Sequence, residues 1–319
     1  MTGRWILLRL ALIAALPIHL AGGAFGQDTQ GPPPQIVSLN TKDGVQLKAT
    51  YFPSSARAGS EQAKQITPVV LLHDYKGTRA ALTPLAQKLQ TTMDGETPRF
   101  AAIVIDLRAH GESTKQLGPG GAEADLDAAK ISKQDYIAMA AFDMEAVRRF
   151  LVDKNDASEL NLNKLSLVGS GMGANVAANW AVQDWSAPPL AVGKQGQDVK
   201  ALVLVSPRWS FNGLSMQAPM KFAPLKLNAS WLLICGAQDS KVKADVGRIE
   251  KQLDRFHPST DKNGAKRRSG LQVSELATSL QGDQLLKSGD AVDDTIVRFL
   301  LENVATETQP WTSRRNKLP

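Results

Sequence analysis

Residues able to carry out acyl-transfer chemistry occur at four places in the sequence, each directly after a short apolar run. They are residues 73–77, 106–113, 169–173 and 235–239. Together they contain serine, histidine and aspartate, the residue types that supply the nucleophile, the base and the orienting acid in hydrolytic catalysis. Such a triad needs each type at a particular place, and the chain has only four histidines. The position of each serine and histidine therefore decides whether hydrolysis is available.

The elements that must position these segments follow a regular order. Residues 35–42 and 45–52 alternate polar and apolar side chains around Asp43-Gly44, which predicts a β-hairpin. Later apolar runs predict strands buried on both faces of a sheet, at residues 69–72, 101–105, 165–168, 201–205, 231–234 and 271–276. Apolar residues at three and four spacing predict helices at residues 80–90, 133–152, 172–183, 243–253 and 291–304. This order predicts one α/β domain over residues 35–305, with a doubly wound, mostly parallel sheet of eight strands.

The four polar segments resemble, in order and in spacing, the strand ends of the α/β-hydrolase family. His73-Asp74-Tyr75-Lys76-Gly77 resembles the oxyanion loop, and Asp106-Leu107-Arg108-Ala109-His110-Gly111-Glu112-Ser113 resembles the loop after the fourth strand. Residues 167–173 resemble the nucleophile elbow, and residues 235–239 resemble the end of the seventh strand, which carries the triad acid. The resemblance is closest to dienelactone hydrolases, esterases and serine aminopeptidases. It implies the α/β-hydrolase fold.

The elbow segment lacks the expected nucleophile. The family pattern is Gly-x-Ser-x-Gly, and Gly169 and Gly173 fill its two outer positions. Gly171 then stands at the nucleophile position, where the strained backbone with positive φ costs a glycine little. We expect the absent side chain to enlarge the floor of the pocket.

Ser170 is the alternative nucleophile. Moving the frame by one residue puts Val168 and Met172 at the positions that must be small. Their side chains would crowd the neighbouring strand and helix, and the Ser170 side chain would point away from the cleft. An active serine hydrolase acting on esters, lactones or peptides would therefore need Ser170 together with a base that the pattern does not reveal.

The histidine expected after the last strand is also absent. The resemblance places the base where this sequence has Asp283. His257 precedes that strand, which suits a surface or capping role, and His19 lies in the N-terminal segment. His73 and His110 belong to the loops and are expected to hold them by hydrogen bonds. No histidine is placed to act as the base.

Of the triad, the resemblance retains only the acid, Asp239. It also implies an oxyanion or ligand site formed by Asp74, Tyr75 and Met172, whose backbone N–H groups open a helix and favour a carbonyl or carboxylate ligand. Asp239 and Asp283 fall on neighbouring loops, where they could share a proton or bind a cation, or remain separately solvated. We expect a protein that binds a small ligand or a protein partner, with no cofactor and no metal.

Composition narrows the alternatives further. The net charge is +6, and part of it is local, at residues 266–268 and 314–317. No aromatic residues are interleaved with these clusters, so a solvated loop and tail are expected rather than a nucleic-acid surface. The single cysteine, Cys235, excludes intramolecular disulfides and a Cys-rich zinc site. Residues 206–230 are long enough for a loop and a short helix but not for a large lid, and their apolar side chains predict local core or a contact surface.

The two ends of the chain have their own character. Residues 1–26 carry Arg4, an apolar stretch and small residues at Ala24 and Gly26, the layout of a secretory signal peptide cleaved after Gly26. An uncleaved membrane anchor is the alternative; after cleavage no membrane span is expected. Export to the periplasm or the medium follows. Residues 27–34 read as a linker and residues 306–319 as a flexible basic tail.

Overall fold

A computed structural model describes residues 31–188, 193–258 and 270–314 of the chain. The predicted signal peptide and most of the predicted linker lie outside these residues. Within the described ranges, no helix has the length and hydrophobicity needed to cross a membrane.

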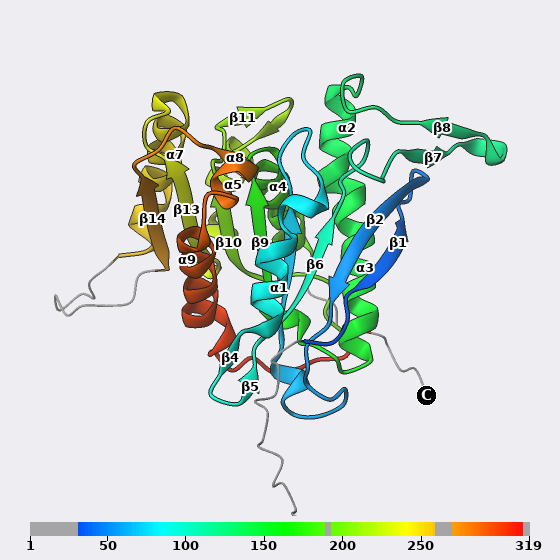
Figure 1. Cartoon of the computed structure of the whole chain (residues 1–319), viewed down its shortest axis with the longest axis vertical. Coiled ribbons are helices and arrows are strands. Elements are labelled where there is room, and N and C mark those ends of the chain that lie inside the picture. The colour runs from blue at the N-terminus through cyan, green and yellow to red at the C-terminus, as the bar shows by residue number, and fades with distance from the viewer. Residues whose placement is uncertain (1–30, 189–192, 259–269, 315–319) are drawn as a thin grey trace, which may run out of the picture.

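A single large sheet forms the centre of the molecule (Figure 1). Its strand order is β14-β13-β10-β9-β3-β6-β2-β7-β8, and β1 pairs with β2. The six strands from β14 to β6 are parallel, as the continuous apolar runs predict. The predicted hairpin joins this sheet through β2, which is antiparallel to β6. The strands are β1 (Gln35–Asn40), β2 (Val45–Phe52), β3 (Thr67–Leu72), β6 (Phe100–Ile105), β7 (Lys115–Leu117), β8 (Glu123–Asp125), β9 (Leu165–Ser170), β10 (Val199–Val205), β13 (Ser230–Gly236) and β14 (Leu271–Leu276).

Helices cover both faces of the sheet (Figure 1). Alternate residues of each strand enter different cores: Val70 and Leu72 of β3 pack in one layer, and Val69 and Leu71 pack in the other. The first layer contains buried residues of α2, α3, α4 and α7, and the second contains those of α1, α8 and α9. The helices are α1 (Thr83–Thr91), α2 (Lys133–Ala138), α3 (Met144–Asp156), α4 (Met172–Ser186), α5 (Gln217–Lys221), α6 (Ala223–Asn228), α7 (Ser240–Leu253), α8 (Gly282–Leu286) and α9 (Asp290–Leu300).

Three features go beyond the prediction. The hairpin β7–β8 extends the predicted eight-stranded sheet to ten strands, and it projects from the body in Figure 1. The predicted helix at residues 133–152 is divided into α2 and α3 by a π-helical turn, Met139–Asp143. This turn places the buried Asp143 carboxylate against Arg108, whose Nε and Nη2 donate to it at 2.9 and 2.6 Å. The short helices α5 and α6 lie within residues 206–230, and Met216 and Met220 in this segment are buried in the local core.

The segment after α9 is anchored, in contrast to the flexible tail expected over residues 306–319. Side-chain amides of Asn161 and Asn163 donate to the backbone carbonyls of Gln309 and Pro310. The Arg314 guanidinium, whose side chain is 2% exposed, donates to both oxygens of the buried Asp198 carboxylate at 2.8 and 2.9 Å. A bidentate ion pair and amide bonds thus fix the chain through residue 314, and residues 315–319 lie outside the described part.

Candidate functional site

The turn from β9 into α4 has the geometry of a strand-to-helix elbow with Gly171 at its tip. Gly171 has φ 49° and ψ −110°, and its N–H donates to the Val205 carbonyl at 2.8 Å. A Cβ on Gly169 would lie 2.4 Å from the Gly173 carbonyl oxygen, and a Cβ on Gly173 would lie 2.4 Å from the Leu72 carbonyl oxygen. These close approaches require glycine at both outer positions. They support the frame that puts Gly171, and not Ser170, at the nucleophile position.

Ser170 is enclosed within the sheet. It is the last residue of β9, pairs with Val205 of β10 and is 0% exposed. Its hydroxyl forms no hydrogen bond of standard geometry. The hydroxyl nevertheless lowers the pKa of Asp283, against the increase that burial causes. A serine without solvent access and without a histidine partner is poorly placed to attack a substrate.

The Asp74 carboxylate binds the two backbone N–H groups that were expected to form the oxyanion site. Its Oδ1 accepts hydrogen bonds from the backbone N–H of Tyr75 at 2.7 Å and from that of Met172 at 2.8 Å. In the nucleophile-elbow arrangement, the N–H of the residue after the nucleophile and an N–H from the loop after β3 hold the substrate oxygen. Here both donors bind an oxygen of the protein itself.

The same carboxylate also fills the space that a nucleophile would need. A Cβ built on Gly171 would lie 2.0 Å from Asp74 Cγ, and a Cβ built on Gly282 would lie 2.2 Å from Asp74 Oδ2. Gly282, which the sequence analysis did not single out, has φ +55° and directly precedes Asp283. The expectation that Gly171 enlarges the pocket floor is therefore wrong, because Asp74 takes up the space released.

Asp283 completes a carboxylate pair with Asp74. It lies in α8, and its Oδ1 accepts the backbone N–H of Asp74 at 3.0 Å. Burial raises the pKa of Asp74, the nearby Asp283 carboxylate raises it further, and the two N–H donors oppose the shift. Burial also raises the pKa of Asp283, against the Ser170 hydroxyl, the Asp74 N–H and the Lys287 ammonium group. Two carboxylates at one site hold a proton more readily than either would alone.

Asp239 does not join this pair. It caps α7, and its Oδ1 accepts the backbone N–H groups of Lys241 and Val242, both at 3.0 Å. No hydrogen bond joins it to Asp283; the carboxyl group beside Asp283 is that of Asp74, and the alternative in which Asp239 and Asp283 share a proton or a cation is not the arrangement in the structure. Among the described residues, no group of three or more His, Cys, Asp and Glu side chains is arranged to hold a metal ion.

The two loop histidines hold backbone. His73 is 0% exposed; its Nδ1 lies 2.7 Å from the Asp74 carbonyl, and its Nε2 accepts the Leu107 N–H at 3.1 Å. Nδ1 therefore carries the proton, and burial lowers the pKa of His73 to about 4. His110 lies 2.8 Å from the Arg108 carbonyl through Nδ1, and burial lowers its pKa too. In the described part of the chain, the hydrogen bonds of both rings go to backbone groups and not to a serine.

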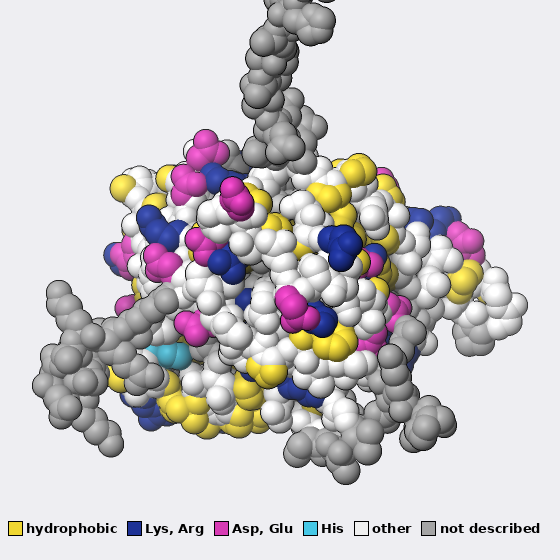
Figure 2. All heavy atoms as spheres, turned by 90° about the horizontal axis from the view of Figure 1, so that it is seen from below, with side chains coloured by type: hydrophobic (Ala, Val, Ile, Leu, Met, Phe, Trp, Pro, Cys, Tyr) yellow, Lys and Arg dark blue, Asp and Glu magenta, His cyan; other side chains and the backbone are white. Residues whose placement is uncertain are grey.

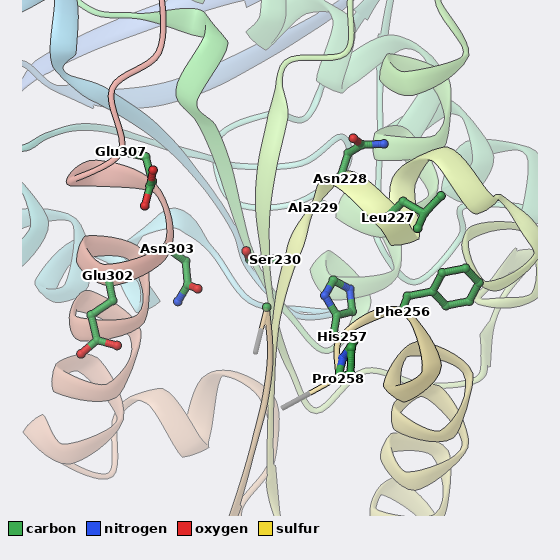
Figure 3. Close-up of a pocket in the computed structure, with 11 residues that line it drawn as sticks. Leu227, Asn228, Ala229, Ser230, Phe256, His257, Pro258, Glu302, Asn303 and Glu307 are labelled. Carbon is green, nitrogen blue, oxygen red and sulfur yellow. The ribbon is translucent and has the colours of Figure 1, made fainter. Parts of the chain in front are cut away.

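His257 lies at the opposite end of the sheet. It borders a cavity of about 260 Å³ next to Ser230, the first residue of β13, whereas Asp239 follows the last residue of that strand (Figure 3). The face at this end of the strands carries acidic and basic side chains interspersed with one another (Figure 2). His257 is thus separated from the elbow by the length of a strand.

An open pocket of about 350 Å³ adjoins the carboxylate pair. Beside it, the Tyr75 ring packs against Tyr136 and Phe211, with ring centroids 6.4 and 6.1 Å away. Solvent reaches the pair from the side of α8. The pocket is lined by Asp74, Tyr75, Lys76, Gly77, Gln281, Asp283, Gln284 and Lys287.

Solved structures place this architecture among the α/β hydrolases. An esterase from Pyrococcus furiosus matches 85% of this chain and 90% of its own, at 15% identity and a TM-score of 0.52. A protein of unknown function from Agrobacterium tumefaciens, assigned to the α/β hydrolases, matches 86% of this chain and all of its own, at 15% identity and a TM-score of 0.51. No protein-family model matches the sequence, and no curated protein matches it significantly. The chain has the α/β-hydrolase fold.

Proposed function

We propose that this chain is an exported α/β-hydrolase-fold protein without serine-hydrolase catalysis, which binds a ligand or a protein partner at its elbow. The observation that carries the proposal is the Asp74 carboxylate, whose Oδ1 accepts the N–H groups of Tyr75 and Met172. Export rests on the signal-peptide pattern of residues 1–26.

Three requirements for acyl transfer are unmet at once. The position of the nucleophile is Gly171, the position of the base is Asp283, and the oxyanion donors already bind Asp74. A nucleophile attacks a carbonyl efficiently only when a base takes its proton and the N–H donors stabilise the developing charge. Restoring one of these groups would still leave the other two absent.

The pocket beside the pair supports a binding role. Lys76 and Lys287 line it, and the Tyr75 and Met172 N–H groups are bound by the Asp74 carboxylate at its edge. Small carbonyl or carboxylate compounds suit such a site, because backbone donors and positive charge both favour a negatively polarised oxygen. A protein partner could present the same group on an acidic side chain or a C-terminus.

Activity-based labelling tests the proposal. The mature chain is treated with a fluorophosphonate probe and assayed for hydrolysis of p-nitrophenyl butyrate, with Ser170→Ala and heat-denatured protein as controls. We expect the native chain and Ser170→Ala to give the same background signal as the denatured protein. Labelling of the native chain that disappears in Ser170→Ala would overturn the proposal in favour of an active serine hydrolase.

A further inference from the structure

A further pocket lies where α1 and α9 begin, apart from the elbow. Its volume is about 220 Å³, below the range of about 300–1,000 Å³ that is usual for drug-sized ligands, so it suits a smaller occupant. It shares Lys287 with the pocket beside Asp74 and Asp283, and its other lining residues are different. The apolar part of its wall consists of Ala81, Pro84, Leu85 and Leu286, and the charged part includes Asp290 and Asp293.

Asp293 occupies a position in α9 that its spacing assigns to the core. Ile296 and Val297 follow it by three and four residues and are buried in the layer that contains α1, α8 and α9. Residues three and four apart lie on the same face of a helix, so the Asp293 side chain faces this layer too. Its exposed fraction is 8%, a degree of burial that carboxylates rarely reach unless they are paired.

The Asp293 carboxylate lacks a partner for its charge. Its Oδ1 is enclosed and has no hydrogen-bond partner among the described residues. Lys88 of α1 acts on it electrostatically, but the Lys88 Nζ is engaged with two other carboxylates, 2.7 Å from Asp294 and 3.9 Å from Asp290. Burial raises the pKa of Asp293 to about 6; Lys88 opposes the shift, and Asp290 and Asp294 add to it. A buried carboxylate without a partner is costly, and a bound cation is one way to compensate for it.

The chemistry of the pocket favours an organic cation over a metal ion. Across the described ranges, no group of three or more His, Cys, Asp and Glu side chains is arranged to hold a metal. An ammonium group offers N–H donors and a positive charge to Asp293, and an apolar substituent on it would pack against side chains such as Leu85 and Leu286. Lys287 is exposed, so solvent screens its opposing charge more than it screens the buried carboxylate.

We propose that this pocket binds a small primary amine, with the Asp293 carboxylate as the counter-ion of its ammonium group. The site is independent of the elbow, so its ligand does not depend on the role proposed for Asp74 and Gly171. A neutral molecule of the same shape would fill the apolar part and leave the carboxylate uncompensated. The two kinds of ligand should therefore differ in affinity by at least about tenfold, the scale of one hydrogen bond to a charged group.

Fluorine NMR with 4-fluorobenzylamine and 4-fluorobenzyl alcohol tests the proposal, because the two probes have nearly the same shape and only the amine is charged. The titrations use the whole chain at about pH 7.5, above the pKa of Asp293, so that its carboxylate is ionised. We expect the amine to bind at least about tenfold more tightly than the alcohol. Asp293→Asn should weaken binding of the amine by at least about tenfold and leave the affinity for the alcohol unchanged.

Two further variants serve as controls. Glu96→Gln removes an exposed carboxylate between β4 (Met93–Asp94) and β5 (Thr97–Pro98), beyond the far end of α1, and should bind both probes like wild type. Ala81→Leu keeps the charge of Asp293 but takes up room in the pocket, so it should weaken binding of both probes. The thermal transition of each variant shows that it is folded, and that of Asp293→Asn should not fall, since the substitution removes a buried charge without a partner.

The outcomes that contradict the proposal are specific. Equal affinity of the wild type for the two probes, or an amine affinity that Asp293→Asn leaves unchanged, would overturn the role of the carboxylate. Amine binding that Ala81→Leu does not weaken would place the probe outside this pocket and overturn the site.

Discussion

Returning a serine to the elbow should destabilise this protein unless Asp74 is removed as well. The Cβ of Gly171→Ser would lie 2.0 Å from Asp74 Cγ, so the carboxylate has to leave the Tyr75 and Met172 N–H groups. Hydrogen bonds to a charged group contribute about 1.5–3 kcal/mol. A non-glycine residue in a sparsely populated backbone conformation adds about 1–3 kcal/mol. Loss of two such hydrogen bonds together with this strain should therefore lower the free energy of unfolding by about 4–9 kcal/mol.

The second half of this prediction is a rescue. In an Asp74→Gly background the overlap is gone, so Gly171→Ser should cost only the backbone strain of about 1–3 kcal/mol. Urea denaturation of the four proteins of this double-mutant cycle measures the coupling between the two positions. Thermal melting gives a parallel reading, at about 2–4 °C for each kcal/mol in chains of roughly this size.

A matched control isolates the effect of positive φ. Gly95 has φ +61°, and a Cβ there would meet nothing within 4 Å. Gly95→Ser should therefore show the cost of a left-handed backbone without any overlap. Equal losses from Gly171→Ser in the wild-type and Asp74→Gly backgrounds would refute the placement of Asp74 against the elbow.

Two further predictions concern buried charges. Arg314→Ala leaves the buried Asp198 with Lys194 at 2.9 Å and Arg148 at 4.0 Å, so unfolding by urea should show a loss of about 3 kcal/mol. Lys130→Ala, in an exposed pair, should change nothing measurable. Lys164 is buried, donates to the Gln65 and Ala305 carbonyls, and has a pKa lowered by burial to about 8. The unfolded chain binds more protons than the folded chain between this value and the ordinary 10.5, so the unfolding free energy should rise with pH there, by up to about 1.4 kcal/mol per unit. Lys164→Met should lose this rise; an unchanged pH slope would contradict it.

The periodicity of the sequence was sufficient for most of the fold. A strand such as β10 is buried on both faces and a helix such as α7 on one. This burial alone produces the continuous apolar run of the strand and the apolar spacing of the helix, so both can be read from the local sequence. The β7–β8 hairpin was not predicted, because its residues are mostly exposed and carry no apolar alternation. The anchored C-terminal segment was missed for a related reason: its order comes from partners such as Asp198, more than a hundred residues away along the chain.

The sequence indicated which residues belong to the candidate site, but it did not indicate how their side chains are arranged. The resemblance of the strand ends to the α/β-hydrolase motifs singled out Gly171, Asp283 and Asp74. Which carboxylates meet depends on the paths of the loops, and the local pattern favoured Asp239 over Asp74 as the neighbour of Asp283. Gly282 has a positive φ, and this backbone conformation directs Asp283 toward the loop after β3. In the sequence, this turn is indicated locally by the Gly282-Asp283 pair.

Residues 309–314 form hydrogen bonds with Asn161, Asn163 and Asp198. Folding during synthesis therefore cannot be completed before these residues have been added. The sheet and its helices can form from residues 31–305, but the buried Asp198 acquires its bidentate partner only when Arg314 has left the ribosome. Until then the nascent chain carries a poorly compensated charge in its interior, which weakens the folded state. The stable form is therefore available only after residue 314 has been made, and the chain remains easier to unfold until that point.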